Sequence, residues 1–210
     1  MQNPLIKYPR TFHFPWSPGL KNDDRMLEST DAWEGTEVVI TEKMDGENTT
    51  MYPDYIHARS LDSLTEEWRE HTKAIWGRVA HEIPAGWRIC GENVTAMHSI
   101  RYTDLLSHFL VYSIWDKEEC LSWDETVEWC AMLGLATVPL IYWGEYSDDV
   151  CKELCRSLNP TTQEGLVVRP AGRFLFRDFT TRVGKYVRAQ HVQTDEHWTH
   201  KKIEYNIVTG

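Results

Sequence analysis

The feature that most constrains the fold of this chain is a succession of short segments rich in β-branched and aromatic residues, with only a few helical stretches between them. Residues 36–41 (TEVVIT) are the clearest example, and this composition is typical of β-strands. The alternation of strands and helices is too irregular for a doubly wound parallel sheet, so we expect an α+β domain with antiparallel sheets. The other strands are expected at residues 48–52, 55–59, 87–91, 108–115, 137–143, 166–169, 173–176 and 182–188.

Helices are predicted where a capping residue precedes an apolar-rich stretch. Ser63 and Glu66 form the SxxE pattern of a capping box, and apolar residues then recur at helical spacing as far as Ile83, just before Pro84. Proline lacks the amide hydrogen that a helix needs, so this helix should end there. Two further helices are expected to start at the capping box of Ser122 and Glu125 and at Ser147, and to end near Gly134 and Leu158.

The first 35 residues are rich in proline, at Pro4, Pro9, Pro15 and Pro18. Proline at this density predicts an irregular arm rather than a regular element. No strong linker interrupts the rest of the chain, so one domain is expected.

Charge is unevenly distributed along the sequence. The net charge of −10 argues against non-specific binding of nucleic acid. Between Glu164 and Arg188, however, only Glu164 and Asp178 oppose six basic residues. This pattern is compatible with a polyanion site, and equally with an ordinary solvated strand face. The six are Arg169, Arg173, Arg177, Arg182, Lys185 and Arg188.

The cysteines and the apolar runs indicate the compartment. Five cysteines, an odd number without CxxC spacing, are typical of reduced cytosolic thiols rather than of a disulfide or zinc framework. The N-terminus lacks the apolar core of a secretion signal, and no apolar run could span a membrane. We therefore expect a cytoplasmic protein with no membrane partner.

Chemically capable residues are expected at the ends of several of these strands. Lys43, Asp45 and Gly46 (KMDG) follow the TEVVIT strand, and Glu92 and Glu164 lie at the ends of later strands. A lone KxDG pattern is weak evidence, but three carboxylates and a second lysine at strand ends can converge on one cleft. The other members of the set are Trp115 with Asp116, and Lys185.

The order of these segments resembles motifs I, III, IIIa, IV and V of the covalent nucleotidyltransferases, which comprise DNA ligases, RNA ligases and mRNA capping enzymes. The resemblance covers residues 36–188. Residues 42–48 (EKMDGEN) are similar to the EKxxGxN form of motif I in RNA ligases, and Arg59-Ser60 and residues 186–195 are also similar to RNA ligases. The resemblance implies the nucleotidyltransferase (ligase adenylylation domain) fold, in which two antiparallel sheets flanked by helices enclose the nucleotide.

The resemblance also implies a set of site residues. Lys43 would attack ATP to form a lysyl-AMP intermediate, assisted by Lys185, and Trp115 would stack on adenine. A neutral lysine is needed for the attack, and nearby cations and partial burial are expected to depress its pKa. The nucleotide-binding residues would be Glu42, Asn48, Arg59, Glu92, Trp115 and Lys185, and Glu164, Asp116 and Glu92 would hold Mg²⁺ or Mn²⁺. Glu92 alternatively accepts a hydrogen bond from the ribose.

The expected function is that of an ATP-dependent RNA ligase in RNA repair, which joins RNA ends or a nicked duplex. Residues 1–210 are expected to form a single minimal nucleotidyltransferase domain with an N-terminal arm (about 1–35) and without an OB-fold or helical C-terminal domain, so RNA binding would come from this domain or from a partner protein. Two alternatives stay open: a minimal ATP-dependent DNA ligase, and a catalytically idle nucleic-acid-binding module. The histidines at 191, 197 and 200 suit capping, packing or RNA contact better than a metal site.

Overall fold

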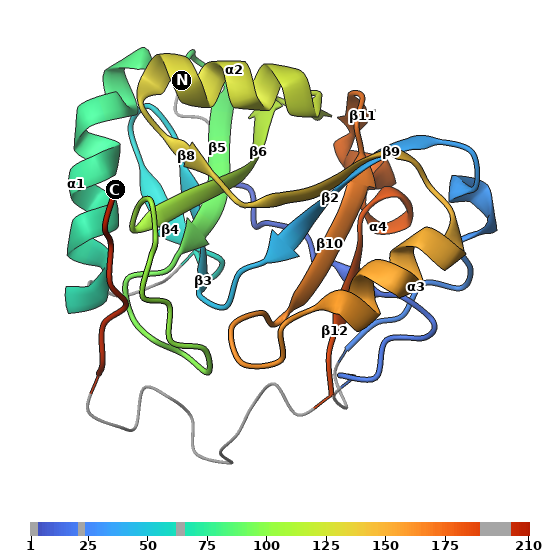
Figure 1. Ribbon diagram of the computed structural model, residues 1–210. Helices are drawn as coiled ribbons and strands as arrows, with labels where there is room; N and C mark the ends of the chain where they lie inside the picture. The colour runs from blue at the N-terminus through green and yellow to red at the C-terminus, as the bar shows by residue number, and fades with distance from the viewer. Residues whose placement is uncertain (1–3, 21–23, 62–65, 190–202) are drawn as a thin grey trace.

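The computed structural model describes residues 4–20, 24–61, 66–189 and 203–210, and it contains two mostly antiparallel sheets (Figure 1). Sheet A consists, in order, of β1 (Phe12–His13), β12 (Gly184–Val187), β10 (Gly165–Pro170), β2 (Glu37–Lys43) and β9 (Leu140–Glu145). Sheet B consists of β11 (Phe174–Leu175), β7 (Glu119–Cys120), β6 (Phe109–Asp116), β5 (Trp87–Asn93), β3 (Glu47–Met51) and β4 (Ile56–Ala58), and β8 (Ala136–Thr137) pairs with β6. The predicted α+β class is confirmed.

Helices cover the outer faces of both sheets. Ile75 and Val79 of α1 (Glu70–Val79) and Cys130 of α2 (Trp123–Leu133) pack on sheet B, whereas Cys151 and Cys155 of α3 (Asp148–Ser157) pack on sheet A. A short helix α4 (Phe179–Arg182), which the sequence did not predict, precedes β12. Single 3₁₀ turns occur at Asp31–Trp33, Glu67–Arg69, Ala80–Glu82 and Phe176–Asp178.

Two of the three predicted helix caps are confirmed. The Ser122 hydroxyl accepts a hydrogen bond from the Glu125 amide, the Glu125 carboxylate accepts one from the Ser122 amide, and Gly134 closes α2 in the left-handed conformation with φ of 64°. Ser147 caps α3 by accepting a hydrogen bond from the amide of Val150. Ser63 lies outside the described residues, but its expected partner Glu66 has extended backbone and α1 begins only at Glu70, so the predicted start of the first helix is wrong.

One predicted strand is divided in two. Residues 137–143 were expected to be continuous, but β8 ends at Thr137 and pairs with sheet B, whereas β9 begins at Leu140 and pairs with sheet A. Pro139 lies between them and cannot donate a hydrogen bond to a ladder. The chain therefore crosses from one sheet to the other at this point.

The alternation of side chains in β2 determines what faces the space between the sheets. Val38 and Ile40 pack with α3 in the core behind sheet A, while Val39 packs with residues of sheet B. Because alternate residues of a strand point to opposite faces, Thr41 and Lys43 lie on the same face as Val39. The predicted TEVVIT strand, β2, thus directs Lys43 at its end toward sheet B.

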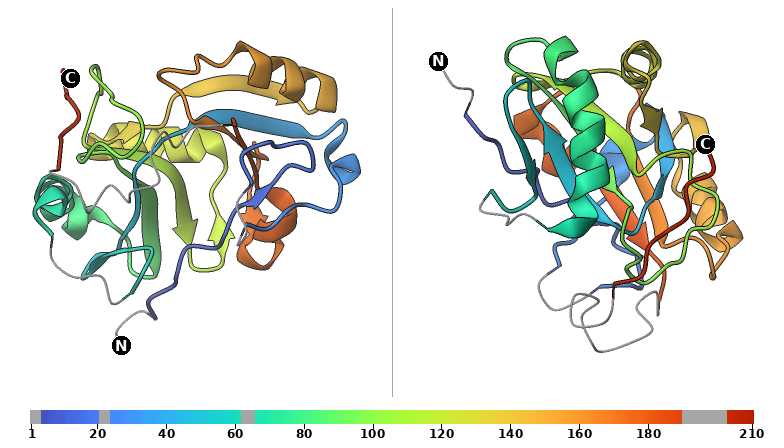
Figure 2. Two further views of the ribbon diagram at one scale, coloured as in Figure 1. Left: turned by 90° about the horizontal axis from the view of Figure 1, so that it is seen from below. Right: turned by 90° about the vertical axis from the view of Figure 1, so that its left-hand side faces the viewer.

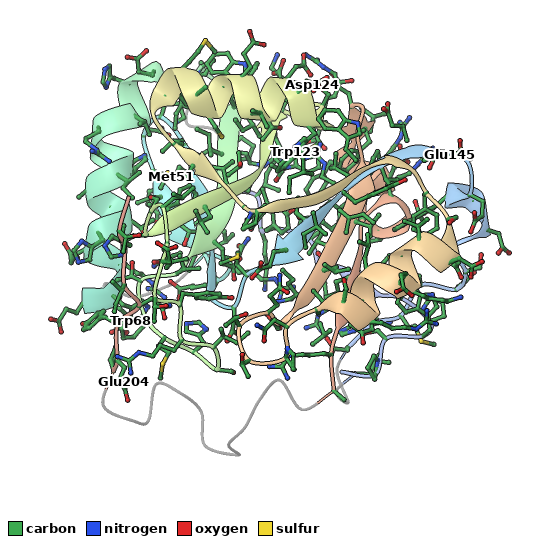
Figure 3. The ribbon with its side chains drawn as sticks, viewed as in Figure 1. Met51, Trp68, Trp123, Asp124, Glu145 and Glu204 are labelled. Atoms are coloured by element: carbon green, nitrogen blue, oxygen red, sulfur yellow. The ribbon has the colours of Figure 1, made fainter. Side chains whose placement is uncertain are left out.

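The interior is filled by large apolar side chains. Buried Met51 and Trp123 lie inside the molecule, whereas exposed Asp124 and Glu145 lie at its periphery (Figure 3). The two views of Figure 2 show the N-terminal segment running along the molecule between the regions of the two sheets. No helix within the described ranges is long and apolar enough to cross a membrane.

Candidate active site

Lys43 and Glu164 form a close ion pair at the ends of two neighbouring strands of sheet A. Lys43 ends β2 and is opposite Gly165 in β10, so Glu164, one residue before that strand, lies beside it. The Lys43 Nζ donates to Glu164 Oε2 at 2.6 Å, and the side chain of Glu164 is only 6% exposed. Strand register therefore brings together two residues that are 121 positions apart.

The protonation of Lys43 differs from the expectation. Burial favours the neutral amine, but the carboxylates of Glu164 and Glu92 outweigh burial, so the pKa of Lys43 lies above its ordinary value. The expected lowering of the Lys43 pKa by neighbouring cations and burial is therefore wrong. Lys43 is an ammonium group held by Glu164.

Glu92 faces the same space from sheet B. It lies in β5 opposite Asn48 of β3. Burial raises the pKa of Glu92 to about 8, with Lys43 opposing the rise and Glu164 and Asp45 adding to it. The negative charge of Glu164 and Asp45 thus disfavours ionisation of Glu92, so additional positive charge here would stabilise its carboxylate form.

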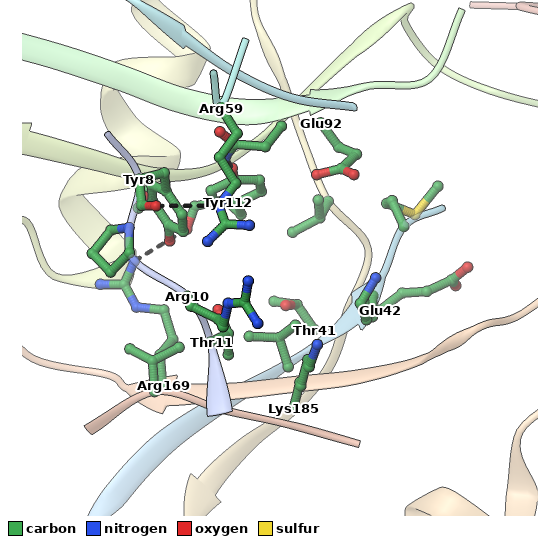
Figure 4. Close-up of a pocket in the computed structure, with 18 of the residues that line it drawn as sticks. Tyr8, Arg10, Thr11, Thr41, Glu42, Arg59, Glu92, Tyr112, Arg169 and Lys185 are labelled. Atoms are coloured by element: carbon green, nitrogen blue, oxygen red, sulfur yellow. Dashed lines mark hydrogen bonds between the residues drawn. The ribbon is translucent and has the colours of Figure 1, made fainter. Parts of the chain in front are cut away.

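A cavity of about 210 Å³ lies between the sheets beside these groups. In Figure 4 the guanidinium groups of Arg10 and Arg59 and the side chain of Lys185 extend into the same space. Of the residues predicted from the sequence, Glu42, Lys43, Asn48, Arg59, Glu92 and Lys185 line the cavity. The cavity is also lined by Tyr8, Pro9, Thr11, Thr41, Met44, Tyr112, Ser113, Val138, Val167, Phe174 and Val183, which the sequence did not predict. Arg169 belongs to the six basic residues of the possible polyanion site, and for Arg10 the sequence left phosphate contact and packing of the N-terminal arm equally open.

Lys185 is held by a second group of charged residues. Its Nζ lies 3.3 Å from Asp24 Oδ1, and the other oxygen of Asp24 lies 3.2 Å from Nε2 of the buried His13. Burial and the nearby Lys43 ammonium lower the pKa of Lys185, while Asp24 opposes them. The two lysines thus lie in one cavity, each paired with its own carboxylate.

The opposite end of the cavity is aromatic. The Tyr8 and Tyr112 rings lie 5.2 Å apart, and Asn48 donates a hydrogen bond to the Tyr112 hydroxyl. Arg169 lies at this end, but it donates to the carbonyls of Tyr112 and Leu121, so its guanidinium supports the backbone. The cavity thus has one end with charged groups and one with aromatic rings, which matches the phosphates and base of a nucleotide.

Trp115 and Asp116 lie away from the cavity, contrary to the sequence-based expectation. Trp115 is 0% exposed among Phe174, Phe176 and Phe179. Asp116 pairs in register with Trp87, whereas Glu92 pairs with Leu110. Because β5 and β6 are antiparallel, the last residues of β6 lie at the end of the sheet opposite Glu92. Tyr112, earlier in the same strand, lines the cavity instead.

The predicted basic face is largely engaged within the protein. Arg173 forms ion pairs with Glu119 and Glu125, and Arg188 donates to the carbonyl of Gln163. Arg169 is buried, as described above. The positive charge of the cavity therefore comes mostly from other parts of the chain, and the histidines at 191, 197 and 200 lie outside the described residues.

The carboxylates of Glu164 and Glu92 could hold a divalent ion only together with other ligands. Across residues 4–20, 24–61, 66–189 and 203–210, no three His, Cys, Asp or Glu side chains are arranged to hold a metal ion. Mg²⁺ commonly takes one or two carboxylates together with phosphate oxygens and water. Glu164 and the half-buried Glu92 fit such a set, whereas Asp116 is too distant along the sheet.

The turn after Lys43 is held by a network that reaches the C-terminal segment. The Asp45 amide donates to the Tyr102 hydroxyl at 2.9 Å, and the amide of Tyr102 donates to Oδ1 of the buried Asn206 at 2.9 Å. The Asp45 carboxylate accepts from the amides of Ser99 and Ile100. Asp45 therefore orders the backbone of the turn instead of facing the cavity.

Comparison with known proteins agrees with this geometry. The family model described as RNA ligase matches residues 36–187. Two variants of the Naegleria gruberi RNA ligase, both solved with ATP and Mn, have TM-scores of 0.57 and 0.55 at 14% identity; the matches cover 91% and 78% of this chain and 63% and 53% of theirs. A putative ATP-dependent DNA ligase from Aquifex aeolicus has a TM-score of 0.51 at 18% identity, over 73% of this chain and 44% of that one.

These structures share the fold of the chain, which spans 63% and 53% of the length of the two Naegleria gruberi ligase structures. No curated protein sequence matches significantly. The family match, by contrast, covers most of the chain and includes the strands that carry Lys43, Glu92, Glu164 and Lys185. The chain belongs to the RNA ligase family.

Proposed function

We propose that this protein is an ATP-dependent RNA ligase that works through a lysyl-AMP intermediate on Lys43. One observation carries the proposal: Lys43, paired with Glu164, faces a cavity into which Arg10, Arg59 and Lys185 also extend. Such a gathering of cations within a chain of net charge −10 favours a polyanionic ligand. The proposal treats residues 1–210 as one nucleotidyltransferase domain.

In the first step the lone pair of Lys43 Nζ attacks the α-phosphorus of ATP. The bond from that phosphorus to the oxygen bridging the α- and β-phosphates breaks, and pyrophosphate leaves with the electron pair. The ammonium must first lose a proton, and Glu164 Oε2, at 2.6 Å, is positioned to receive it. Arg59 and Lys185 stabilise the charge that develops on the phosphates.

A divalent ion held by Glu164 and Glu92 would supply further charge neutralisation to the phosphate oxygens. Glu92 otherwise accepts a hydrogen bond from the ribose. Asn48 and the backbone around Glu42 form the wall beside the nucleotide, and Gln163 holds the Glu42 carboxylate at 2.9 Å.

The two later steps restore Lys43. An oxygen of a 5′-phosphate attacks the phosphorus of lysyl-AMP, the phosphorus–nitrogen bond breaks, and AMP passes to the nucleic-acid end. The 3′-hydroxyl oxygen of the other end then attacks that 5′-phosphorus, loses its proton and displaces AMP. RNA ends or a nicked duplex are the proposed substrates, bound by this domain or with the help of a partner protein.

Transfer of label from ATP tests the first step. Wild-type protein incubated with α-labelled ATP and Mg²⁺ should acquire covalent label that survives denaturing electrophoresis and is released by acid, as expected for a phosphoramide. Lys43→Arg should acquire none, because a guanidinium remains protonated and cannot attack. Lys73→Arg on α1, whose lysine pairs with Glu70, is the matched control and should label normally. Label on Lys43→Arg would disprove the assignment of the nucleophile.

A pair of nicked duplexes tests the preference for RNA. They differ only in ribose or deoxyribose at the 3′-hydroxyl end. An RNA ligase can sense the 2′-hydroxyl and the A-form shape of that strand, so the ribose substrate should be sealed faster. Equal rates, or a preference for the all-DNA nick, would favour the DNA ligase alternative.

A further inference from the structure

Residues 4–19 of the N-terminal arm, hereafter the arm, precede the part of the chain that the RNA ligase family model matches. They nevertheless form one wall of the cavity. We propose that this arm completes the nucleotide site: Arg10 binds the phosphate chain of the nucleoside triphosphate, and Tyr8 forms the wall beside its base. The inference rests on the proposed function, because it names further residues for the same ligand.

The arm is tied to both sheets. On sheet A, β1 pairs in parallel with β12, and the amides of Phe14 and Gly19 donate to the carbonyls of Lys185 and Val187 at 2.9 and 3.0 Å. On the other side, the amide of Ile6 donates to the Tyr52 hydroxyl at 2.9 Å. Residues 8–11 lie between these attachments, so their position over the cavity is fixed at both ends.

Tyr8 is placed to contact a flat ligand. Its ring lies 5.2 Å from the rings of Tyr112 and Phe179, with edge-to-face geometry in both cases. Its carbonyl accepts from Arg59 Nε at 3.5 Å, which joins the arm to a cation of the cavity. Aromatic rings stack on nucleobases with little dependence on hydrogen bonding, so this wall suits the base.

Arg10 is placed at the charged end. In Figure 4 its guanidinium occupies the space between Arg59 and Lys185. An arginine fork can donate two parallel hydrogen bonds to phosphate oxygens, which makes it a stronger phosphate ligand than a single amine. Lys7, three residues earlier, is exposed and does not line the cavity. The arm thus carries one cation directed into the site and one outside it.

The difference between Arg10 and Lys7 allows a direct test by ATP binding. Calorimetry in a Lys43→Ala background measures binding of Mg-ATP without the covalent step. Arg10→Ala should weaken ATP binding by roughly tenfold or more, because it removes charge-assisted hydrogen bonds to phosphate. Arg10→Lys should restore part of the affinity, and Lys7→Ala should leave it unchanged. Equal affinity in Arg10→Ala and Lys7→Ala would overturn the assignment of Arg10.

Tyr8 is tested in the same assay. Tyr8→Phe keeps the ring and should bind Mg-ATP about as tightly as the background protein, while Tyr8→Ala should bind several-fold more weakly. Thermal melting of each variant identifies any that do not fold. If Tyr8→Ala does not fold, the affinity of Tyr8→Phe for Mg-ATP shows whether removal of the hydroxyl alone weakens binding. Affinity that falls equally in Tyr8→Phe and Tyr8→Ala would show that the ring is not the wall of the base site.

These outcomes are separable from the proposed function. If wild-type protein binds Mg-ATP but acquires no covalent label, the lysyl-AMP mechanism is wrong, and the roles of Arg10 and Tyr8 are still decided by affinity. If label forms and Arg10→Ala binds like Lys7→Ala, the mechanism stands and the arm inference is wrong.

Discussion

The N-terminal arm and the C-terminal segment, residues 203–210, both lie outside the family match, but they contact the site in different ways. The arm places side chains in the cavity itself. The C-terminal segment reaches the site through Asn206 and Tyr102, which hold the turn after Lys43. If the proposed function holds, the two segments contribute separately: the arm to binding of the nucleotide, and the C-terminal segment to the geometry of Lys43.

The largest effect is expected at Asn206. Its side chain accepts from the Tyr102 amide and donates to the carbonyls of Val94 and Ala96, all in a buried setting. Asn206→Ala should lower the free energy of unfolding by about 3 kcal/mol, since several buried groups lose their partners. Labelling at saturating ATP should slow, while the KM for ATP stays unchanged.

Ile207→Ala is the control for this change, because Ile207 is 46% exposed in the same segment. Chemical denaturation and an ATP titration of labelling provide the two measurements. A KM that rises in Asn206→Ala as it does in Arg10→Ala would remove the distinction between the two segments.

The next effect concerns pH and the arm. Burial and the neighbouring Lys185 lower the pKa of His13 from 6.5 to about 4, against the influence of Asp24. Between those two values the unfolded chain binds more protons than the folded one, so stability falls as the pH falls through this window. The loss should reach roughly 2 kcal/mol between pH values of about 7 and about 5.

Denaturant titrations at both pH values measure that loss. His13→Gln should show a smaller pH dependence than the wild type, because the titrating group is removed. His81→Gln, at an exposed histidine, serves as the comparison and should behave like the wild type. Identical pH dependence in all three proteins would contradict the prediction.

A smaller effect is expected from crowding the arm against β12. A Cβ added at Gly19 would lie 2.7 Å from the Val187 carbonyl oxygen and 2.9 Å from that of Arg188, so the backbone must shift. Gly19→Ala should cost about 1 to 2 kcal/mol of stability and raise the KM for ATP. Gly172→Ala, where no atom lies within 4 Å, should do neither. An unchanged KM in a destabilised Gly19→Ala would separate docking of the arm from nucleotide binding.

The smallest effect is expected at Tyr102, which connects the C-terminal segment to the turn. Tyr102→Phe removes the hydroxyl that accepts from the Asp45 amide but retains the buried ring. The loss of one hydrogen bond should cost about 1 kcal/mol. Slower labelling with an unchanged KM is expected, and single-turnover labelling at saturating ATP measures it. A rate equal to that of the wild type would show that the turn is ordered by Ser99 and Ile100 alone.

Local patterns predicted much of this molecule. The TEVVIT strand, the capping box of Ser122 and Glu125, and the Ser147 cap depend on neighbours within a few residues, and the structure contains each of them. The proximity of Lys43 and Glu164 followed from the order of motifs, which is information from a family rather than from spacing. Local chemistry and family order together therefore gave the class of fold and the charged end of the cavity.

The remaining errors arise from long-range pairing. Trp115 and Asp116 were expected at the cavity because they end a strand, but the direction of that strand relative to β5 places them at the other end. The sequence left open whether Arg10 contacts phosphate or belongs to a packed arm, because its position depends on β1 pairing with β12, some 170 residues later. Proline-rich sequence gives no local signal for such a partner. Tyr112 could have been identified only with the register of β6.

The turn from β2 into β3 joins the two sheets directly, and this has a mechanical consequence. Lys43 ends a strand of sheet A, and Glu47 begins a strand of sheet B four residues later. Glu164 moves with Lys43, because β10 and β2 share a ladder, while Glu92 belongs to the other sheet. A change in the angle between the sheets would thus alter the separation of Lys43 and Glu92 and leave the pair of Lys43 and Glu164 intact.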